Sequence, residues 1–467
     1  MCKNYITLSD MLLFVCSVIA FPIKRAYAEV ELGLFPDTLD KLFIDGQLHT
    51  FFRHDSNPYF GIAADARGRT ETTFGETVAK LGFTFEKNLA WTNLEGRVSG
   101  ILMSTINADV YGAADDESQA DLNEGYLTFK KINQSPFDIK VGRQNIFIEK
   151  LFIVGDATPE DAAIWISAYR SFPFAVRVDG DFGKLKILAF WADTELYSQQ
   201  GDQRELGKRG KKGVSLAGIN MHYDFLDTAY LYGGYYRKTD DSNITFTGFS
   251  PGGKDLLSEN NTNALDVGLD ATVEQFHFAG EFVYQLGDAG RLGGQELVRD
   301  AYAGFAQAQY NFNHSKNPYL KFMYVFFSGD SDLEDDEAED YDPMFIVGRV
   351  WNEWVIGELV GETQLFNTNK YAFIVETGFS PLPRMKLSFM FIKHYLDEQY
   401  LGVSRGRRAL NSDDYANEWN LLIDYEVNSH VFAHVGAGYI IPGSAAEEFF
   451  GNDDDTIFTQ MWLKFNF

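Results

Sequence analysis

The last segment of the chain limits its fold more than any other part of the sequence. From residue 460 to the end, Met461, Leu463, Phe465 and Phe467 alternate with mainly polar residues. An alternation of period two predicts a β-strand with one apolar and one polar face. The same pattern also suits an ordinary strand at the end of a soluble domain, so the rest of the chain has to decide between the two.

The N-terminus predicts export. An apolar run at 11–21 follows Lys3 and is too short to cross a bilayer as a helix. It leads to the small-residue pattern Ala26-Tyr27-Ala28, so we expect a signal peptide over residues 1–28, with cleavage after Ala28. A single domain would then occupy residues 29–467.

Both cysteines, Cys2 and Cys16, lie in the predicted signal peptide. The mature chain is therefore expected to contain no disulfide, no thiolate metal site and no cysteine nucleophile. No apolar run after residue 28 is long enough for a membrane-spanning helix. A membrane role would consequently have to be carried by strands.

The formal net charge of −27 argues against nucleic-acid binding, which needs a basic surface. Much of the acidity falls in blocks at 115–117, 330–342 and 453–455, which are typical of solvated loops. The block at 330–342 lacks the glycine and the spacing of an EF-hand calcium loop. No cofactor and no metal is therefore expected.

Alternating segments of about eight to ten residues recur along the chain and are separated by turns or polar loops. Residues 265–273 and 276–284 form one such pair, and 371–379 and 385–393 form another. Long loops are expected at 111–121, 198–213, 240–263, 328–343 and 400–416. Short turns alternating with long loops predict an all-β, up-and-down antiparallel barrel.

Three features favour a transmembrane barrel over a soluble sandwich, a propeller or a β-helix. There is no domain linker and no fixed repeat. The 41 Phe and 24 Tyr suit a lipid-facing band with aromatic girdles. Charged residues in mid-strand, such as Asp266 and Glu281, would be costly in a packed core and are acceptable in a wet lumen. At about 24 residues per strand and connection, roughly 18 strands fit, which leaves an aqueous channel.

Several motifs together resemble the alginate export outer-membrane porin family. They are LNEGYLTF at 122–129, FDIKVGRQNI at 137–146, DAAIWIS at 161–167, RSFPFAVRVDGD at 170–181, EWNLLIDYEVN at 418–428, GYIIPG at 438–443 and the terminal strand. The resemblance implies an 18-stranded monomeric barrel in the outer membrane of a Gram-negative cell. It implies passage of an anionic polysaccharide through an arginine-rich constriction. The terminal strand resembles the closing strand of such barrels, in which Phe467, Phe465 and Leu463 would form the assembly signal.

We expect the basic lining of this channel to come from the polar faces of the strands. Alternation places Glu95 with Arg97 and Arg177 with Asp179, and such neighbours can simply pair with each other. Arg143 shares its parity with apolar neighbours, so it would face lipid unless a bulge at Gly142 resets the register. The substrate-path candidates are Arg97, Lys140, Arg143, Arg170, Arg177, Lys186, Arg237, Arg349, Arg384, Lys386, Glu95 and Asp179.

Acidic residues predicted on the lumen side offset these cations, so the cargo is left open between two classes. One is an anionic or polar, alginate-like polysaccharide, and the other is small anions or sugars passing through a general or selective porin. An enzyme on a barrel is not expected, because no serine near the eight histidines lies in a nucleophile motif. The basic loop at 198–213 is expected to be solvated, with gating or lipopolysaccharide binding as its alternatives. Expected partners are outer-membrane lipid and lipopolysaccharide, the barrel-assembly machinery, the polysaccharide and possible periplasmic export partners, with no nucleic acid.

Overall fold

The computed structural model describes residues 30–31, 39–61, 70–107, 117–155, 162–163, 165–166, 171–193, 214–240, 261–292, 295–332, 334–344, 357–365, 367–401 and 408–467. The predicted signal peptide, the basic loop at 198–213, Arg170 and Arg349 lie outside these residues. The signal peptide and the domain boundary at residue 28 therefore stay predictions.

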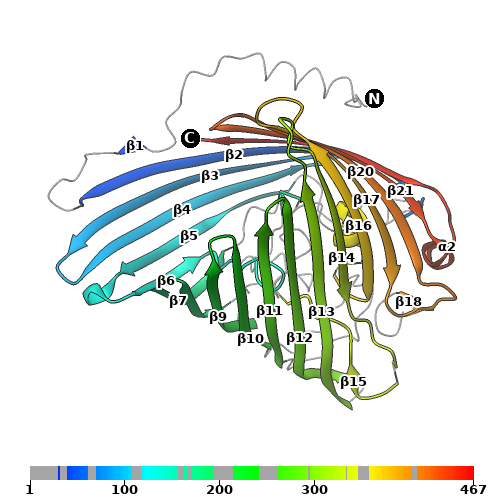
Figure 1. Ribbon diagram of the computed structural model, residues 1–467, viewed down its shortest axis with the longest axis horizontal. Helices are drawn as coiled ribbons and strands as arrows, with labels where there is room; N and C mark the ends of the chain where they lie inside the picture. Colours follow the sequence, from blue (N-terminus) through cyan, green and yellow to red (C-terminus); the bar gives the residue numbers. More distant parts are fainter. Residues whose placement is uncertain are drawn as a thin grey trace.

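Eighteen antiparallel strands form one closed wall (Figure 1). In chain order they are β2 (Lys41–Ser56), β3 (Glu71–Leu89), β4 (Thr92–Ile106), β5 (Ser118–Lys130), β6 (Phe137–Gln144), β7 (Phe172–Phe182), β8 (Leu185–Asp193), β9 (Val214–Leu226), β10 (Ala229–Asp240), β11 (Asn261–Val273), β12 (Phe276–Leu292), β13 (Gln295–Asn311), β14 (Tyr319–Phe327), β16 (Lys370–Phe379), β17 (Met385–Leu396), β20 (Asp414–Asn428), β21 (Val431–Pro442) and β22 (Thr456–Asn466). Each strand pairs with the next, so the predicted up-and-down barrel is confirmed.

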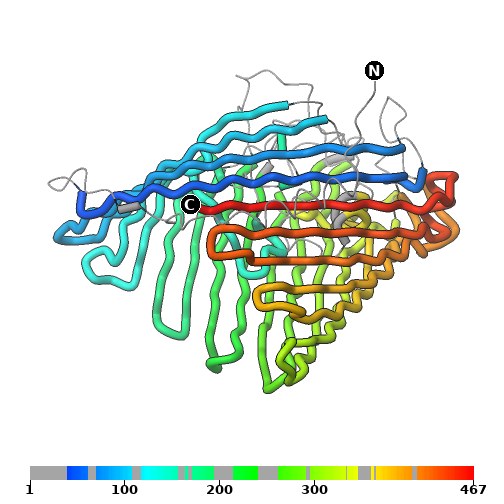
Figure 2. The backbone as a smooth tube through the Cα atoms, turned by 90° about the horizontal axis from the view of Figure 1, so that it is seen from above, coloured from blue at the N-terminus to red at the C-terminus, as the bar shows by residue number. Residues whose placement is uncertain are grey.

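The terminal strand closes the barrel. β22 pairs with β21 on one side and with β2 on the other, where Phe51 lies opposite Trp462 and Arg53 opposite Gln460. Figure 2 shows the red C-terminal strand beside the blue β2. The backbones of Gly46 and Phe467 exchange two hydrogen bonds of 2.7 and 2.9 Å. The closing position predicted for this strand is therefore correct, and the role of its residues as an assembly signal stays a prediction.

The alternation predicted from the sequence determines which residues face lipid. On β11, Leu265 and Val267 are 49% and 57% exposed on the outer face, whereas Asp266 between them is buried on the inner face. Because neighbouring strands pair in register, apolar side chains of adjacent strands form one continuous outer band. The barrel thus presents an apolar outside and a charged inside.

Short turns join the strands at one rim and long connections join them at the other. The short rim includes the turns at 183–184, 227–228 and 274–275, and the long rim includes the connections at 145–171 and 328–369. Three predicted loops were too long, since β5, β11 and β20 begin at Ser118, Asn261 and Asp414. The polar ends of these strands extend beyond the apolar band, and for that reason they were mistaken for loop.

Two long connections fold into the barrel, which the sequence did not reveal. Between β6 and β7, Phe152 packs against Phe327 of β14, with ring centroids 5.4 Å apart. Between β14 and β16, Tyr341 joins the same apolar cluster, together with Leu359 and Val360 of the π-helix η3 (Gly357–Gln364). These segments occupy part of the inner space of the barrel and narrow the channel. The first of them reaches the wall near the short turns, where Lys150 bonds Asp270 and Glu149 contacts His222.

The remaining elements are short. They are β1 (Val30–Glu31), η1 (Ile132–Gln134), β15 (Glu337–Ala338), β18 (Tyr400–Leu401), β19 (Arg408–Ala409) and α2 (Ser444–Phe450). No helix within the described ranges is long and apolar enough to cross a membrane.

Candidate channel lining

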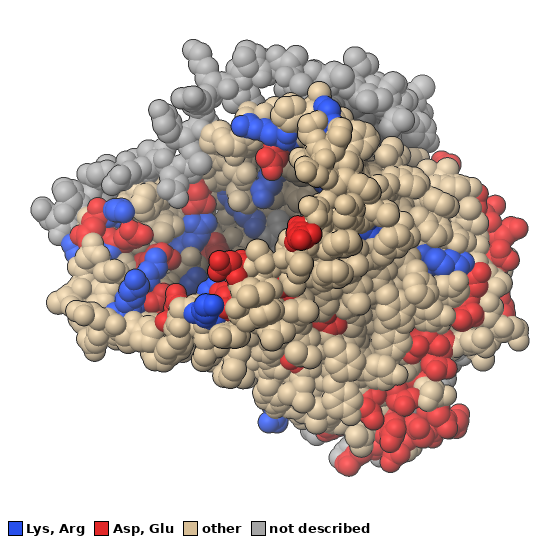
Figure 3. Space-filling model, viewed as in Figure 1, with Lys and Arg blue, Asp and Glu red and all other residues tan. Residues whose placement is uncertain are grey.

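Basic side chains follow one another across the inner faces of five consecutive strands. The outer positions of these strands hold Val98, Leu127 and Trp191, which are exposed and apolar. The inner positions, from β4 to β8, hold Arg97, Lys130, Lys140, Arg177 and Lys186, a set called here the basic arc. Figure 3 shows blue and red side chains interleaved around a hollow on this side of the molecule.

Arg97 is held by two carboxylates. It donates to both oxygens of Asp45 at 2.6 and 2.9 Å and to Glu124 at 2.7 Å. A further hydrogen bond of 2.9 Å reaches the hydroxyl of Thr84. Because one charged partner comes from the adjacent strand β5 and the other from β2, two strands away, the guanidinium is fixed against the wall. Most of its charge is neutralised locally.

Lys140 and Arg177 lie opposite each other on β6 and β7. Arg177 forms a bidentate pair with Asp179, with three N···O distances of 2.6 to 3.0 Å, as the sequence predicted. Lys140 instead lies 4.2 Å from the ring centroid of Tyr126. Among the described residues, no carboxylate lies within ion-pair distance of Lys140. This ammonium group is therefore free to meet an anion in the lumen.

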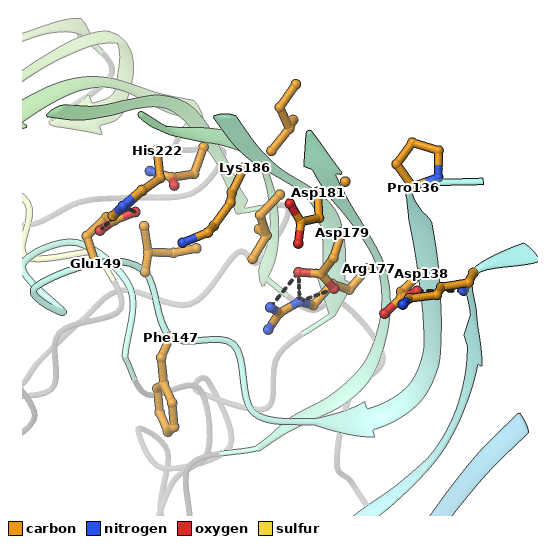
Figure 4. Close-up of a pocket in the computed structure, with 15 residues that line it drawn as sticks. Pro136, Asp138, Phe147, Glu149, Arg177, Asp179, Asp181, Lys186 and His222 are labelled. Atoms are coloured by element: carbon orange, nitrogen blue, oxygen red, sulfur yellow. Dashed lines mark hydrogen bonds and ion pairs between the residues drawn. The ribbon is translucent and has the colours of Figure 1, made fainter. Parts of the chain in front are cut away.

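A cavity of about 660 Å³ opens beside the arc, near the short-turn rim. Its wall comes from β6 to β9 and its other side from the inserted segment that follows β6, which contributes Phe147 and Glu149. Figure 4 shows Arg177, Asp179, Asp181 and Lys186 extending from the strands toward this segment. His222 lies between Glu149 and Asp224, 3.3 Å from the first carboxylate and 3.0 Å from the second.

Acidic residues dominate the opposite part of the wall. As predicted, Asp266, Asp270, Glu281, Glu376 and Asp424 lie on inner faces. Most have basic or hydroxyl partners: Asp270 bonds Lys150 and His277, Glu376 bonds Lys321, and Asp424 bonds His434. Cations and carboxylates thus stand side by side around the lumen, on the side of the basic arc as on this side, and ion pairs reduce the charge on both.

Two candidates lie outside this lining. Arg237 shares the outer face of β10 with the exposed Leu231 and Tyr235, so placing it on the substrate path was wrong. The inner residue is its neighbour Lys238, which the sequence analysis missed. Arg384 lies in the exposed turn between β16 and β17, with a left-handed φ of 63°, and does not line the wall.

The other candidates are placed as follows. Glu95 pairs with Lys130 inside the arc, and Lys386 lies 3.5 Å from Glu376. The predicted irregularity at Gly142 is present: its φ is 124°, and the register with β7 jumps from Gly142 to Gln144. Within the part of the chain that the structure describes, no group of three or more His, Cys, Asp or Glu side chains is arranged to hold a metal ion.

A closed barrel of 18 strands, with an apolar outside and a charged lumen, defines an outer-membrane channel. Residues 174–460 match the alginate export family, so the chain belongs to that family, which comprises channels and not enzymes. A search among well-described proteins finds no significant match to the sequence.

Solved structures agree on the fold. Acinetobacter baumannii OccAB1 is similar with a TM-score of 0.56 and 11% identity, covering 91% of this chain and 96% of its own. Pseudomonas aeruginosa OccK9 has a TM-score of 0.55 and 10% identity, and the match covers 92% of this chain and 98% of its own. Acinetobacter baumannii OccAB4 has a TM-score of 0.54 and 11% identity, and the match covers 92% of this chain and 99% of its own. At these identities the likeness shows the barrel alone.

Proposed function

We propose that this channel passes an anionic or polar polysaccharide across the outer membrane. The observation that carries the proposal is the basic arc, and within it Lys140, whose ammonium group has no carboxylate partner among the described residues. A uronate polymer carries one carboxylate per sugar, and Lys and Arg side chains bind carboxylates through charge-assisted hydrogen bonds.

The pairing of the other cations supports passage rather than retention. Arg97 and Arg177 already share their charge with Asp45, Glu124 and Asp179. A polymer would therefore meet many weak sites and one stronger one, and conduction requires binding that is weak and spread over several sites. Membership of the alginate export family supports the same class of cargo.

A pore for small anions or sugars is the second candidate. It is favoured by the inserted connections, which narrow the lumen beside the cluster that contains Phe152 and Tyr341. The outer membrane surrounds the barrel in either case. Lipopolysaccharide contact, the assembly machinery, periplasmic partners and a monomeric state stay predictions.

Planar bilayers separate the two candidates. The reversal potential in a KCl gradient is measured first, and then the current block by a mannuronate pentamer and by cellopentaose, a neutral pentamer. We expect anion preference and a block by the mannuronate pentamer that weakens about three- to tenfold in Lys140→Gln. Lys184→Gln, which removes the same charge from an exposed turn, should leave the block unchanged.

Clear cation preference, with no block by the acidic pentamer, would contradict the anionic polymer. Anion preference with no block by either pentamer, but with permeation by small carboxylates, would favour the second candidate.

A further inference from the structure

Phe147 is an exposed aromatic residue that lines a cavity in the lumen. It follows β6 on the inserted segment, where Ile146 and Ile148 are buried against the wall. Phe147, between them, is 44% exposed and lines the cavity. Aromatic residues on the outer face contact lipid, whereas the ring of Phe147 lies inside the barrel and does not. A flat apolar surface left open in a cavity is suited to a ligand.

The cavity that Phe147 lines also offers hydrogen-bond acceptors. Asp138 accepts the Lys131 backbone N–H at 2.7 Å, and Asp181 accepts the Gly183 N–H at 2.9 Å. Each carboxylate uses one oxygen in this way. The second oxygen has no protein partner among the described residues, so it remains available to a donor from the lumen.

The charges of the cavity do not select an anion. Four carboxylates line it, those of Asp138, Glu149, Asp179 and Asp181, against the three cations Lys131, Arg177 and Lys186. Two of these cations are already paired, Arg177 with Asp179 and Lys186 with Asp224 at 3.3 Å. One aromatic face and free acceptors in the same cavity match a hydroxyl-rich ring with a C–H face, which is the chemistry of a saccharide.

We propose that this cavity is a sugar-ring subsite, in which one sugar lies on Phe147 and its hydroxyls donate to Asp138 and Asp181. The inference deepens the proposed function. Lys140 lies directly opposite Arg177, which lines the cavity, so a carboxylate on the same or the next sugar reaches Lys140. The subsite binds the sugar ring, and Lys140 binds the carboxylate. The volume of about 660 Å³ suits a unit of one to three sugars.

A binding experiment with the full-length protein in detergent separates ring binding by the subsite from carboxylate binding by Lys140. Dissociation constants are measured by calorimetry for cellopentaose and the mannuronate pentamer, with Phe147→Ala, Phe147→Trp, Phe147→Leu and Lys140→Gln. Phe147→Ala should weaken both pentamers about five- to tenfold, because the stacking surface is lost. Phe147→Trp should retain binding of both, and Phe147→Leu, which is apolar but not flat, should not. Lys140→Gln should weaken only the acidic pentamer.

Folding of each variant is checked by its heat-modifiable mobility, and a variant that fails this check is replaced by Phe147→Tyr, which should retain binding. The subsite is overturned if Phe147→Ala binds cellopentaose as tightly as the unaltered chain does, if Phe147→Leu equals Phe147, or if cellopentaose does not bind at all. Loss of the Lys140 effect with the Phe147 effect intact would instead contradict the anionic cargo and leave the subsite standing.

Discussion

Replacing Lys238 with Met is expected to release the inserted connection between β14 and β16. Lys238 projects inward from β10 and bonds both oxygens of Asp342 at 2.7 and 3.0 Å, with the side chains 7% and 5% exposed. Asp342 also accepts the Met344 N–H at 2.8 Å, and its backbone exchanges two hydrogen bonds with Gln285 of β12. The connection is thus fastened to the wall at this residue, in addition to the pairing of β15 with β13 and the hydrogen bond of 2.7 Å from Arg299 to the Asp340 carbonyl.

Removing one partner of a buried ion pair leaves an uncompensated charge, at a cost of about 3–5 kcal/mol. If this cost falls on the closed position of the connection, the open population rises by about two to four orders of magnitude. We expect faster proteolysis at residues 328–344 and a larger single-channel conductance. The double variant Lys238→Met with Asp342→Asn should recover most of the loss, because it removes the unpaired charge and keeps an acceptor for Met344.

Acidity adds an independent check on the same contact. Burial alone would raise the pKa of Asp342, but the charges of Lys238 and Arg299 and the hydrogen bonds from Lys238 and Met344 outweigh it and hold the pKa at about 2. Because the pKa is lowered in the closed position, the ionised carboxylate stabilises that position at pH values above the unfolded pKa near 3.8. This stabilisation is lost only as the pH falls through 2. The contact should therefore not change between pH 4 and 8. Proteolysis and conductance of Lys238→Met equal to those of the unaltered chain and of Lys184→Met would refute this reasoning.

Three further predictions concern the contact of Gly46 with Phe467 where the barrel closes, the loop after β17, and the outer face of β10. Gly46→Val should lower the yield of folded barrel, measured by heat-modifiable mobility, because a Cβ at this position would overlap the Phe467 ring; Gly100→Val, with no close neighbour, is the control. Burial raises the pKa of Asp397, in the loop after β17, to about 6, with repulsion from Glu398 and Glu339 adding to the effect and the hydrogen bond from Gly329 opposing it. Because the folded pKa is raised, this loop loses stability as the pH rises from 4 through 6. Asp397→Asn should slow its proteolysis at pH 7.5 by about threefold, a discounted part of the tenfold expected per pKa unit, with no gain at pH 4. Arg237→Gln should leave ion selectivity unchanged, since its side chain lies on the outer face; a shifted reversal potential would place it on the ion path.

The wall could be predicted because a barrel in lipid imposes its pattern on every strand. Leu265 and Val267 must face lipid and Asp266 must not, so each strand carries its orientation in its own residues. The sequence also marked Gly142 as the place where a bulge could reset the register, and the register with β7 does shift there. Arg237 was misplaced because the alternation of its strand, plain from Tyr235 and Leu231, was not carried through to it.

The inserted segments could not be predicted in this way. Phe152 contacts Phe305 and Phe327, residues more than 150 positions away, and nothing in the segment around it repeats with a period of two. Its partners are chosen by the curvature of the closed wall, which no local pattern contains. The ring of Phe147 carries the same lesson, because an exposed aromatic residue has meaning only once the cavity around it is known.

The net charge of −27 is a poor guide to the charge of the cargo, and the structure explains why. Exposed acids such as Asp332, Glu334 and Asp336 lie in the connection beside β15, away from the basic arc. Charges on an exposed rim are screened by salt within about 10 Å, whereas a cargo in the lumen meets side chains at hydrogen-bond distance. The field along the path is therefore set by the few groups that remain unpaired after Arg97 and Arg177 have met their carboxylates. Lys140 is such a group, and a single substitution there is a stronger test of the cargo than the sum of all other charges.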